Sequence, residues 1–177
     1  MKQRVPCLIL SLLLLLVLAA CQSKREATQI TLDERALSYE TVISLVRSAC
    51  DGLCPAYRVT LRGDGQVLYK GFLNVQTDGT AEGSVTPETV RQVLTRFMEI
   101  DFYSLQDQYI NGEKGCPLAP IGPPSISISL SLDGKHKEVK VQDCWFSRDA
   151  DELWALADFI DQATVTDRWV GARTPDP

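Results

Sequence analysis

The fold is decided by the stretch Tyr57-Arg58-Val59-Thr60-Leu61-Arg62-Gly63-Asp64-Gly65-Gln66-Val67-Leu68-Tyr69-Lys70, in which apolar and polar side chains alternate on both sides of a short turn. Such alternation is the pattern of a strand that buries one of its faces. Asp64-Gly65 is a dipeptide that closes tight turns between antiparallel strands. The stretch therefore predicts a β-hairpin.

The second half of the chain repeats this pattern. Apolar residues alternate with serines in its first predicted strand, at Ile126, Ile128, Leu130 and Leu132. Asp133-Gly134 predicts a turn, and the return strand holds Lys137, Val139 and Val141. The repeat is compatible with an internal duplication, although antiparallel α+β domains reach the same order by other routes.

A helical pattern follows each predicted hairpin. Thr86 suits the N-cap position of the first helix and Pro87 its first turn. The apolar face of this helix comprises Val90, Val93, Leu94 and Phe97, and that of the second comprises Leu153, Leu156, Ala157 and Ile160. Residues 41–46 and 80–85 predict extra strands, although Leu37, Val42 and Leu45 would also suit a helix.

These patterns predict an α+β domain. Its antiparallel sheet would be built from two β-hairpins plus extra strands, in the order β-ββ(β)-α-ββ-α. The two amphipathic helices would pack on one face of the sheet, because the apolar faces of the hairpins need cover. Residues 106–124 are the longest irregular segment, and long loops are either functional or disordered.

The N-terminus has the pattern of a lipoprotein signal peptide. Lys2 and Arg4 precede an apolar run at residues 8–18, which is too short to span the ~30 Å hydrocarbon core as a helix. Leu18-Ala19-Ala20-Cys21 resembles a bacterial lipobox, whose cysteine is acylated with fatty acids such as palmitate and becomes the first mature residue. An uncleaved signal anchor or a plain secretory signal is the alternative.

The expected organisation follows from this pattern. Residues 1–20 would be the signal peptide, 21–29 the lipidated Cys21 with a polar tether, 30–172 a single domain and 173–177 a tail. Two or three acyl chains anchor stably, whereas one holds only marginally. Gln22 follows the expected lipidation site. By resemblance to enterobacterial lipoproteins, a residue other than aspartate at this position favours the outer membrane, whereas aspartate retains the protein in the inner membrane. We therefore expect a lipoprotein of the cell envelope, in the outer membrane facing the periplasm.

Charge narrows the range of partners. The first twenty residues hold two of the 18 Lys and Arg and none of the 23 Asp and Glu, which leaves 16 against 23, a net charge of −7. Nucleic acid and anionic lipid headgroups are therefore poor partners. The membrane contact expected here is the N-terminal lipid alone.

Four of the six cysteines remain after the signal and the lipidation site: Cys50, Cys54, Cys116 and Cys144. An even number in an oxidising compartment predicts disulfides, and three connectivities are possible. We favour Cys50 with Cys54 and Cys116 with Cys144. Chain entropy gives about 2 kcal/mol for the small loop and about 3.5 kcal/mol for the longer one.

The sequence offers few candidates for catalytic or metal-binding residues. Cys50 and Cys54 could instead form a redox or thiolate copper pair, with a loose likeness to copper-delivery proteins, although Asp51 would raise a thiol pKa. His136, the single histidine, lies between two lysines beside a turn and is expected in solvent. Paired carboxylates remain conceivable among Asp51, Asp64, Asp78 and Asp143. We predict no catalytic residue, no cofactor and no metal ligand.

Several of these residues also carry a family resemblance. Cys50-Asp51-Gly52-Leu53-Cys54-Pro55-Ala56-Tyr57, the segment from Gly63 to Gly71, residues 101–105 and Tyr109 resemble a family of bacterial envelope proteins, domain of unknown function 6438. The resemblance covers residues 42–170. It implies a signal peptide or lipobox and a later cysteine pair like Cys116 and Cys144, which supports the favoured pairing.

The chain departs from this family at two places. Asp51 replaces a usual aromatic residue, and residues 119–124 lack a common threonine-aspartate pair. The resemblance implies no reaction, substrate or catalytic residue. The leading hypothesis is a non-enzymatic interaction domain for an envelope protein or a cell-wall ligand. The alternatives are an inhibitor of an envelope hydrolase, which would present residues 106–124, and a thiol redox protein that uses Cys50 and Cys54.

Overall fold

The computed structural model describes residues 36–38, 40–50, 52–118, 125–144 and 147–171. The expected signal peptide at 1–20, the lipidation site Cys21, the tether and the tail at 173–177 lie outside the described residues. Among the described helices, none has the length and apolar character needed to cross a bilayer.

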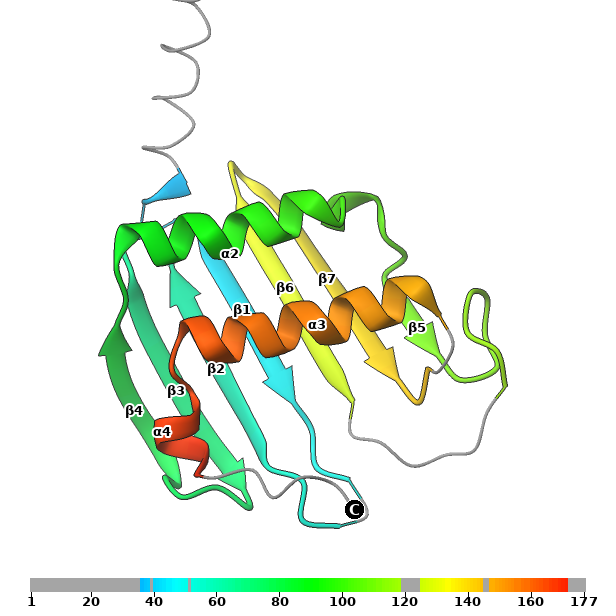
Figure 1. The fold of residues 1–177 in the computed structure, drawn as a ribbon, viewed down its shortest axis with the longest axis horizontal. Helices are drawn as coiled ribbons and strands as arrows, with labels where there is room; N and C mark the ends of the chain where they lie inside the picture. The colour runs from blue at the N-terminus through cyan, green and yellow to red at the C-terminus, as the bar shows by residue number, and fades with distance from the viewer. Residues whose placement is uncertain (1–35, 39, 51, 119–124, 145–146, 172–177) are drawn as a thin grey trace, which may run out of the picture. The chain divides into compact units, whose positions relative to one another are not determined.

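The described strands form one sheet of seven strands in the order β4-β3-β2-β1-β6-β7-β5 (Figure 1). They are β1 (Val42–Arg47), β2 (Ala56–Arg62), β3 (Gln66–Leu73), β4 (Gly79–Ser84), β5 (Gln108–Ile110), β6 (Ile126–Leu132) and β7 (Lys135–Gln142). β1 joins the two hairpins, because it pairs antiparallel with β2 on one side and with β6 on the other. β5 is the exception in direction, since it pairs parallel with β7.

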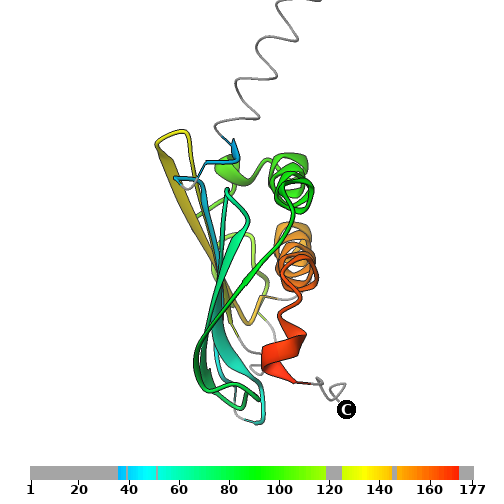
Figure 2. The ribbon, with the colours of Figure 1, turned by 90° about the vertical axis from the view of Figure 1, so that its left-hand side faces the viewer.

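Two helices, α2 (Pro87–Glu99) and α3 (Arg148–Ala163), cover the same face of this sheet (Figure 2). The first begins as its sequence predicts: Thr86 is the N-cap, and its Oγ1 accepts a hydrogen bond of 3.2 Å from the Thr89 backbone N–H. Two shorter helical elements complete the fold, η1 (Phe102–Ser104) and α4 (Asp167–Val170).

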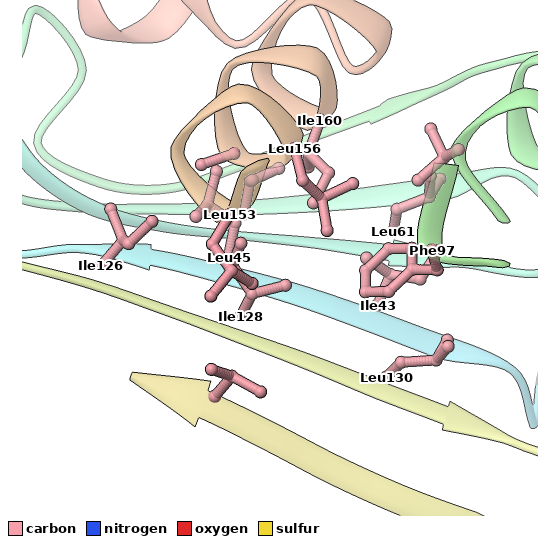
Figure 3. Close-up of a cluster of buried hydrophobic side chains, with 14 of the residues drawn as sticks. Ile43, Leu45, Leu61, Phe97, Ile126, Ile128, Leu130, Leu153, Leu156 and Ile160 are labelled. Carbon is pink, nitrogen blue, oxygen red and sulfur yellow. The ribbon is translucent and has the colours of Figure 1, made fainter. Parts of the chain in front are cut away.

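The core lies between the sheet and the two helices. Strand residues Ile43, Leu45, Leu61, Ile126, Ile128 and Leu130 face helix residues Phe97, Leu153, Leu156 and Ile160 (Figure 3). All ten are buried. Full burial of an apolar side chain of this size contributes about 1.5–3 kcal/mol, so this layer is the main source of stability.

The predicted architecture is confirmed. Both hairpins, the extra strands, the two helices and their packing on one face are present. Of the predicted strand at 41–46, residues 42–46 lie in β1, which extends to Arg47 and is not a helix. One expectation needs correction: residues 106–124 are not wholly irregular, because β5 lies within them. A strand of three residues is too short to show alternation in the sequence. η1 and α4 were not predicted either.

Candidate functional site

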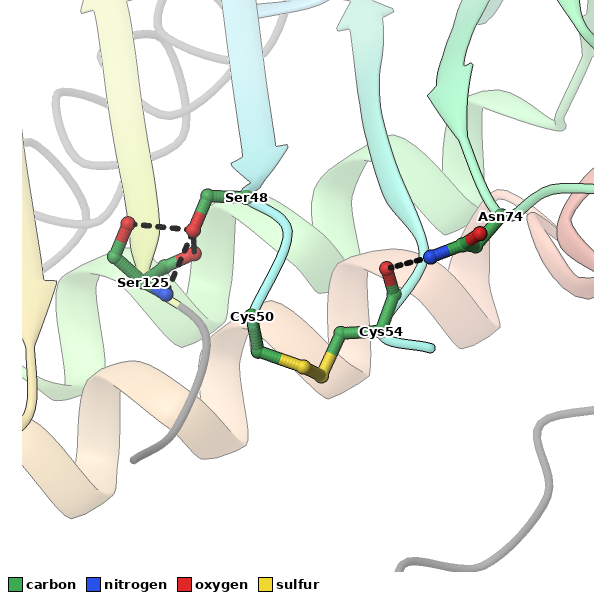
Figure 4. Close-up of a disulfide and its surroundings, with 5 residues drawn as sticks. All are labelled: Ser48, Cys50, Cys54, Asn74 and Ser125. Carbon is green, nitrogen blue, oxygen red and sulfur yellow. Dashed lines mark hydrogen bonds between the residues drawn. A yellow bond between two sulfur atoms is a disulfide. The ribbon is translucent and has the colours of Figure 1, made fainter. Parts of the chain in front are cut away.

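The first feature of interest is the loop between β1 and β2. A disulfide joins Cys50 to Cys54, with 5.5 Å between their Cα atoms, which is the pairing that the sequence favours. Leu53, inside this small ring, has 84% of its surface exposed. The Asn74 side-chain amide donates to the Cys54 carbonyl at 3.3 Å, which ties the loop to the end of β3 (Figure 4).

The second feature is the segment that follows β5. A disulfide joins Cys116 to Cys144, with a Cα separation of 5.3 Å, and both cysteines are buried. Backbone hydrogen bonds from Gly112 N to Cys116 O at 3.1 Å and from Cys116 N to Glu113 O at 3.0 Å fold this segment into compact turns. Leu118, two residues beyond the bridge, is 85% exposed.

Both bridges lie at the same end of the sheet, where β1 and β7 end (Figure 1). Ser48 and Ser125 join the two loop regions, through Ser48 N to Ser125 O at 3.0 Å and Ser125 N to Ser48 Oγ at 2.8 Å (Figure 4). We call this region, comprising residues 48–50, 52–56, 72–74, 111–118, 125 and 143–144, the disulfide end.

The chain enters the domain at the opposite end. The Thr41 carbonyl accepts a hydrogen bond of 2.9 Å from Gly63 N, beside the turn between β2 and β3. The six residues of β1 separate this point from Ser48. At about 3.3 Å per residue, the entry point and the disulfide end are roughly 20 Å apart.

Of the six large apolar side chains that are exposed among the described residues, four lie at the disulfide end. Besides Leu53 and Leu118, Phe72 is 46% and Leu73 is 52% exposed. Leu73 is the Cα partner of Ala56, so the tip of β3 lies beside the loop that carries Leu53. Single exposed apolar residues are ordinary, so the feature that distinguishes these four is the end of the domain that they share.

A hollow of about 620 Å³ lies beside the Cys116 bridge. Its lining includes Glu113, Leu118, Ser147, Arg148 and Asp149. The Asp149 carboxylate accepts a 2.8 Å hydrogen bond from the buried Tyr109 hydroxyl, and the pKa of Tyr109 is raised by burial and by this carboxylate. The lining combines apolar surface with both signs of charge.

A buried ionic cluster holds the end of β1 against α3. Arg47 Nε donates to Asp161 Oδ2 at 2.8 Å, and its Nη2 lies 2.6 Å from Asp158 Oδ1. The Tyr57 hydroxyl donates to the same Asp161 oxygen at 2.8 Å. Burial alone would lower the pKa of Arg47, but Asp161, Tyr57 and Asp158 together raise it above its ordinary value. The cluster therefore clamps the end of β1 to α3.

The sequence held a signal for this clamp that was missed. Arg47 continues the alternation of Ile43 and Leu45, which places it on the core face of β1. Asp161 continues the helical repeat of Ala157 on the core face of α3. A cation and an acid that both fall at core positions of packed elements predict a buried pair.

The described candidates for catalytic residues, a histidine and three aspartates, do not lie together in one site. His136 is exposed, with its Nδ1 2.9 Å from Ser131 Oγ. Asp64 accepts a hydrogen bond of 3.0 Å from Gln66 N within its turn, Asp78 is exposed, and Asp143 is buried beside Cys144. Asp51 lies outside the described residues. Over the described ranges, no three His, Cys, Asp or Glu side chains gather as a metal site would require.

Comparison with known proteins identifies the family to which the chain belongs. The model of Domain of unknown function (DUF6438) matches residues 41–164 of the 177. A search of curated proteins gives no match. The matched range holds the seven described strands, both disulfides, α2 and α3, and it stops before α4. The chain therefore belongs to the DUF6438 family.

Proposed function

We propose that this protein is a lipid-anchored interaction protein of the bacterial envelope, whose domain binds another protein through the disulfide end without catalysing a reaction. The lipid would be attached at Cys21, in the segment Leu18-Ala19-Ala20-Cys21. Gln22 after this cysteine favours the outer membrane as the location.

The observation that carries the proposal is the exposure of two leucines on braced loops. Leu53 and Leu118 are 84% and 85% exposed, and each lies within or beside a segment that a disulfide fixes. Burying a leucine fully contributes about 1.5–3 kcal/mol. A braced loop loses little conformational entropy when it binds, so more of this contribution remains as affinity.

The position of the tether supports the same interaction. Lipidation at Cys21 would leave residues 22–35 between the anchor and the domain. Even fully extended, these residues reach at most roughly 50 Å. The chain joins the domain opposite the disulfide end, which leaves that end free to meet a partner while the domain stays close to the membrane.

An inhibitor of an envelope hydrolase is the second candidate. The observation that favours it is Leu118, which follows Pro117 directly after the buried Cys116 bridge and projects into solvent. A rigid exposed loop of this kind can occupy the cleft of an enzyme. The redox alternative has less support, because Cys54 leads into strand β2 and gains no helix N-terminus that would lower a thiol pKa.

Site-specific photocrosslinking in living cells tests the proposal. A photoreactive amino acid replaces Leu53 or Leu118 in the full lipidated chain, and Lys135 is the matched control because it is exposed at the opposite end of β7. The expected result is one adduct of the same mass from both leucine positions and none from Lys135. Equal adducts from all three positions, or none from either leucine, would overturn the proposal. A hydrolase in the adduct would favour the inhibitor.

A further inference from the structure

The face of the sheet opposite the helices carries an unusual charge distribution. In the part of the chain that the structure describes, no helix covers this face (Figure 2). Four cations point to it, Arg58, Arg62, Lys70 and Lys140, against two carboxylates, Glu82 and Glu138. This face is therefore net positive in a chain whose formal net charge is −5.

Two of these cations face one another across neighbouring strands. Arg58 on β2 is the Cα partner of Lys70 on β3, and both side chains are exposed. Like charges directly opposite each other in a sheet destabilise it. Among the described residues, neither forms an ion pair; Lys70 Nζ lies 5.6 Å from the centroid of the Phe72 ring. By contrast, Arg47, Arg91, Arg96, Lys137 and Arg148 each pair with a carboxylate.

The two cations belong to a longer row across the sheet. Successive Cα partners place Thr80, Lys70, Arg58, Val46, Ser127 and Lys140 side by side on β4, β3, β2, β1, β6 and β7. The row holds three cations and no acid. Glu82 and Glu138 belong to the next row, opposite Leu68 and Ser129, and the Glu138 carboxylate accepts a hydrogen bond from Ser127.

The row also adjoins the disulfide end. Arg58 is two residues beyond Ala56, and the exposed Phe72 follows Lys70 by two residues on β3. At a strand spacing of about 4.8 Å, Lys70 and Arg58 are neighbours, and Lys140 lies three strands away from Arg58, roughly 14 Å. The row therefore holds one adjacent pair of cations, and Val46 and Ser127 separate this pair from Lys140.

We propose that this cationic row binds carboxylates of an acidic segment of the partner protein. The inference rests on the proposed function, because it names the chemistry of the partner that would lie on the disulfide end. A carboxylate between Arg58 and Lys70 would turn a repulsive pair into two charge-assisted hydrogen bonds. An anionic bilayer or a nucleic acid fits less well, because its extended negative charge would meet the negative charge of the whole domain.

A binding assay with a defined probe tests this inference. The full chain, in a non-ionic detergent, is titrated into a fluorescent peptide of about ten residues that alternates glutamate with leucine. The double variant Arg58→Gln, Lys70→Gln should bind the peptide about tenfold more weakly, equivalent to about 1.4 kcal/mol. The matched control Lys135→Gln should bind as the parent does, and a peptide with glutamine for glutamate should not bind. Unfolding curves of both variants exclude misfolding as the cause.

Three outcomes would overturn the inference. The first is equal binding of the acidic peptide by the double variant, and the second is equal binding of the glutamine peptide. The third is that vesicles of phosphatidylglycerol, but not the peptide, bind in a manner that depends on Arg58 and Lys70. The test separates this inference from the proposed function: crosslinks from Leu53 and Leu118 without peptide binding reject the cationic row alone. Peptide binding without those crosslinks rejects the proposed function alone.

Discussion

Two neighbouring tyrosines give the sharpest prediction, because their hydroxyl groups differ in one respect. Tyr57 and Tyr69 are both buried, and their ring centroids are 5.9 Å apart. The Tyr57 hydroxyl donates to Asp161 at 2.8 Å. The Tyr69 hydroxyl is buried with no hydrogen-bond partner among the described residues. The same substitution, tyrosine to phenylalanine, should therefore have opposite effects at the two positions.

The magnitudes follow from the contacts. Burying a hydroxyl without a partner costs about 1–3 kcal/mol, so Tyr69→Phe should raise the free energy of unfolding by about 1 kcal/mol or more. The ring of Tyr69 stacks on Trp169 at 5.1 Å, and phenylalanine keeps this contact. Tyr57→Phe removes a hydrogen bond to a charged group, so it should lower the free energy of unfolding by about 1.5–3 kcal/mol.

Urea unfolding of the two variants and the parent, followed by circular dichroism, measures both effects. Thermal midpoints should move by roughly 3–5 °C for each kcal/mol in a domain of this size. The m-values should stay unchanged, because neither substitution alters the surface exposed on unfolding. If Tyr69→Phe lowers the free energy of unfolding by as much as Tyr57→Phe does, the Tyr69 hydroxyl is hydrogen-bonded and the reasoning is wrong.

Three further predictions concern pH, the anchor and the bridges. Burial, with the charges of Asp161 and Asp78, raises the pKa of Tyr69 in the folded protein from 10.0 to about 12. The folded state therefore keeps the proton more tightly than the unfolded chain does. The free energy of unfolding is unaffected by this group below pH 10 and falls as the pH rises from 10 to 12. Alkaline titration of the free energy of unfolding should show this loss, at most about 3 kcal/mol, and Tyr69→Phe should lack it. Cys21→Ser should move the protein from the membrane to the soluble periplasmic fraction and abolish fatty-acid labelling; continued labelling would contradict the lipid anchor. Cys116→Ser should lower the free energy of unfolding by about 2–5 kcal/mol and expose the segment after β5 to proteolysis, whereas Cys50→Ser should cost less because it opens a shorter loop. Equal losses in urea unfolding would contradict this order.

The sequence predicts the part of the fold that alternation encodes. Val59 and Leu61 alternate with Arg58 and Thr60 because one face of β2 meets the helices and the other meets solvent. Thr86 marks the start of α2 because its hydroxyl replaces a hydrogen bond that the first helical turn lacks. Such signals are local, so a reader of the sequence can find them without knowing the tertiary contacts.

The remaining features depend on contacts between distant residues. β5 has three residues, and it exists because Asn111 N donates to Gln142 O and Lys140 N donates to Asp107 O beside it. Arg47 and Asp161 are 114 residues apart, so no local pattern pairs them. The candidate site was half predicted: the four cysteines were identified, whereas the clustering of exposed leucines at one end required the strand order.

The contacts that hold the loops of the disulfide end in place also serve its proposed role in binding. Among the described residues, the β1–β2 ladder ends at the pair Arg47 and Tyr57, and the loop that carries Leu53 lies beyond it. The Cys50–Cys54 bridge, the Ser48–Ser125 hydrogen bonds and the Arg47–Asp161 ion pair replace that ladder. An unbraced loop could fold its leucine back onto the core, which would hide the apolar surface and raise the entropy cost of binding. Covalent and ionic bracing therefore keeps Leu53 in solvent, at the end of β1 opposite Thr41.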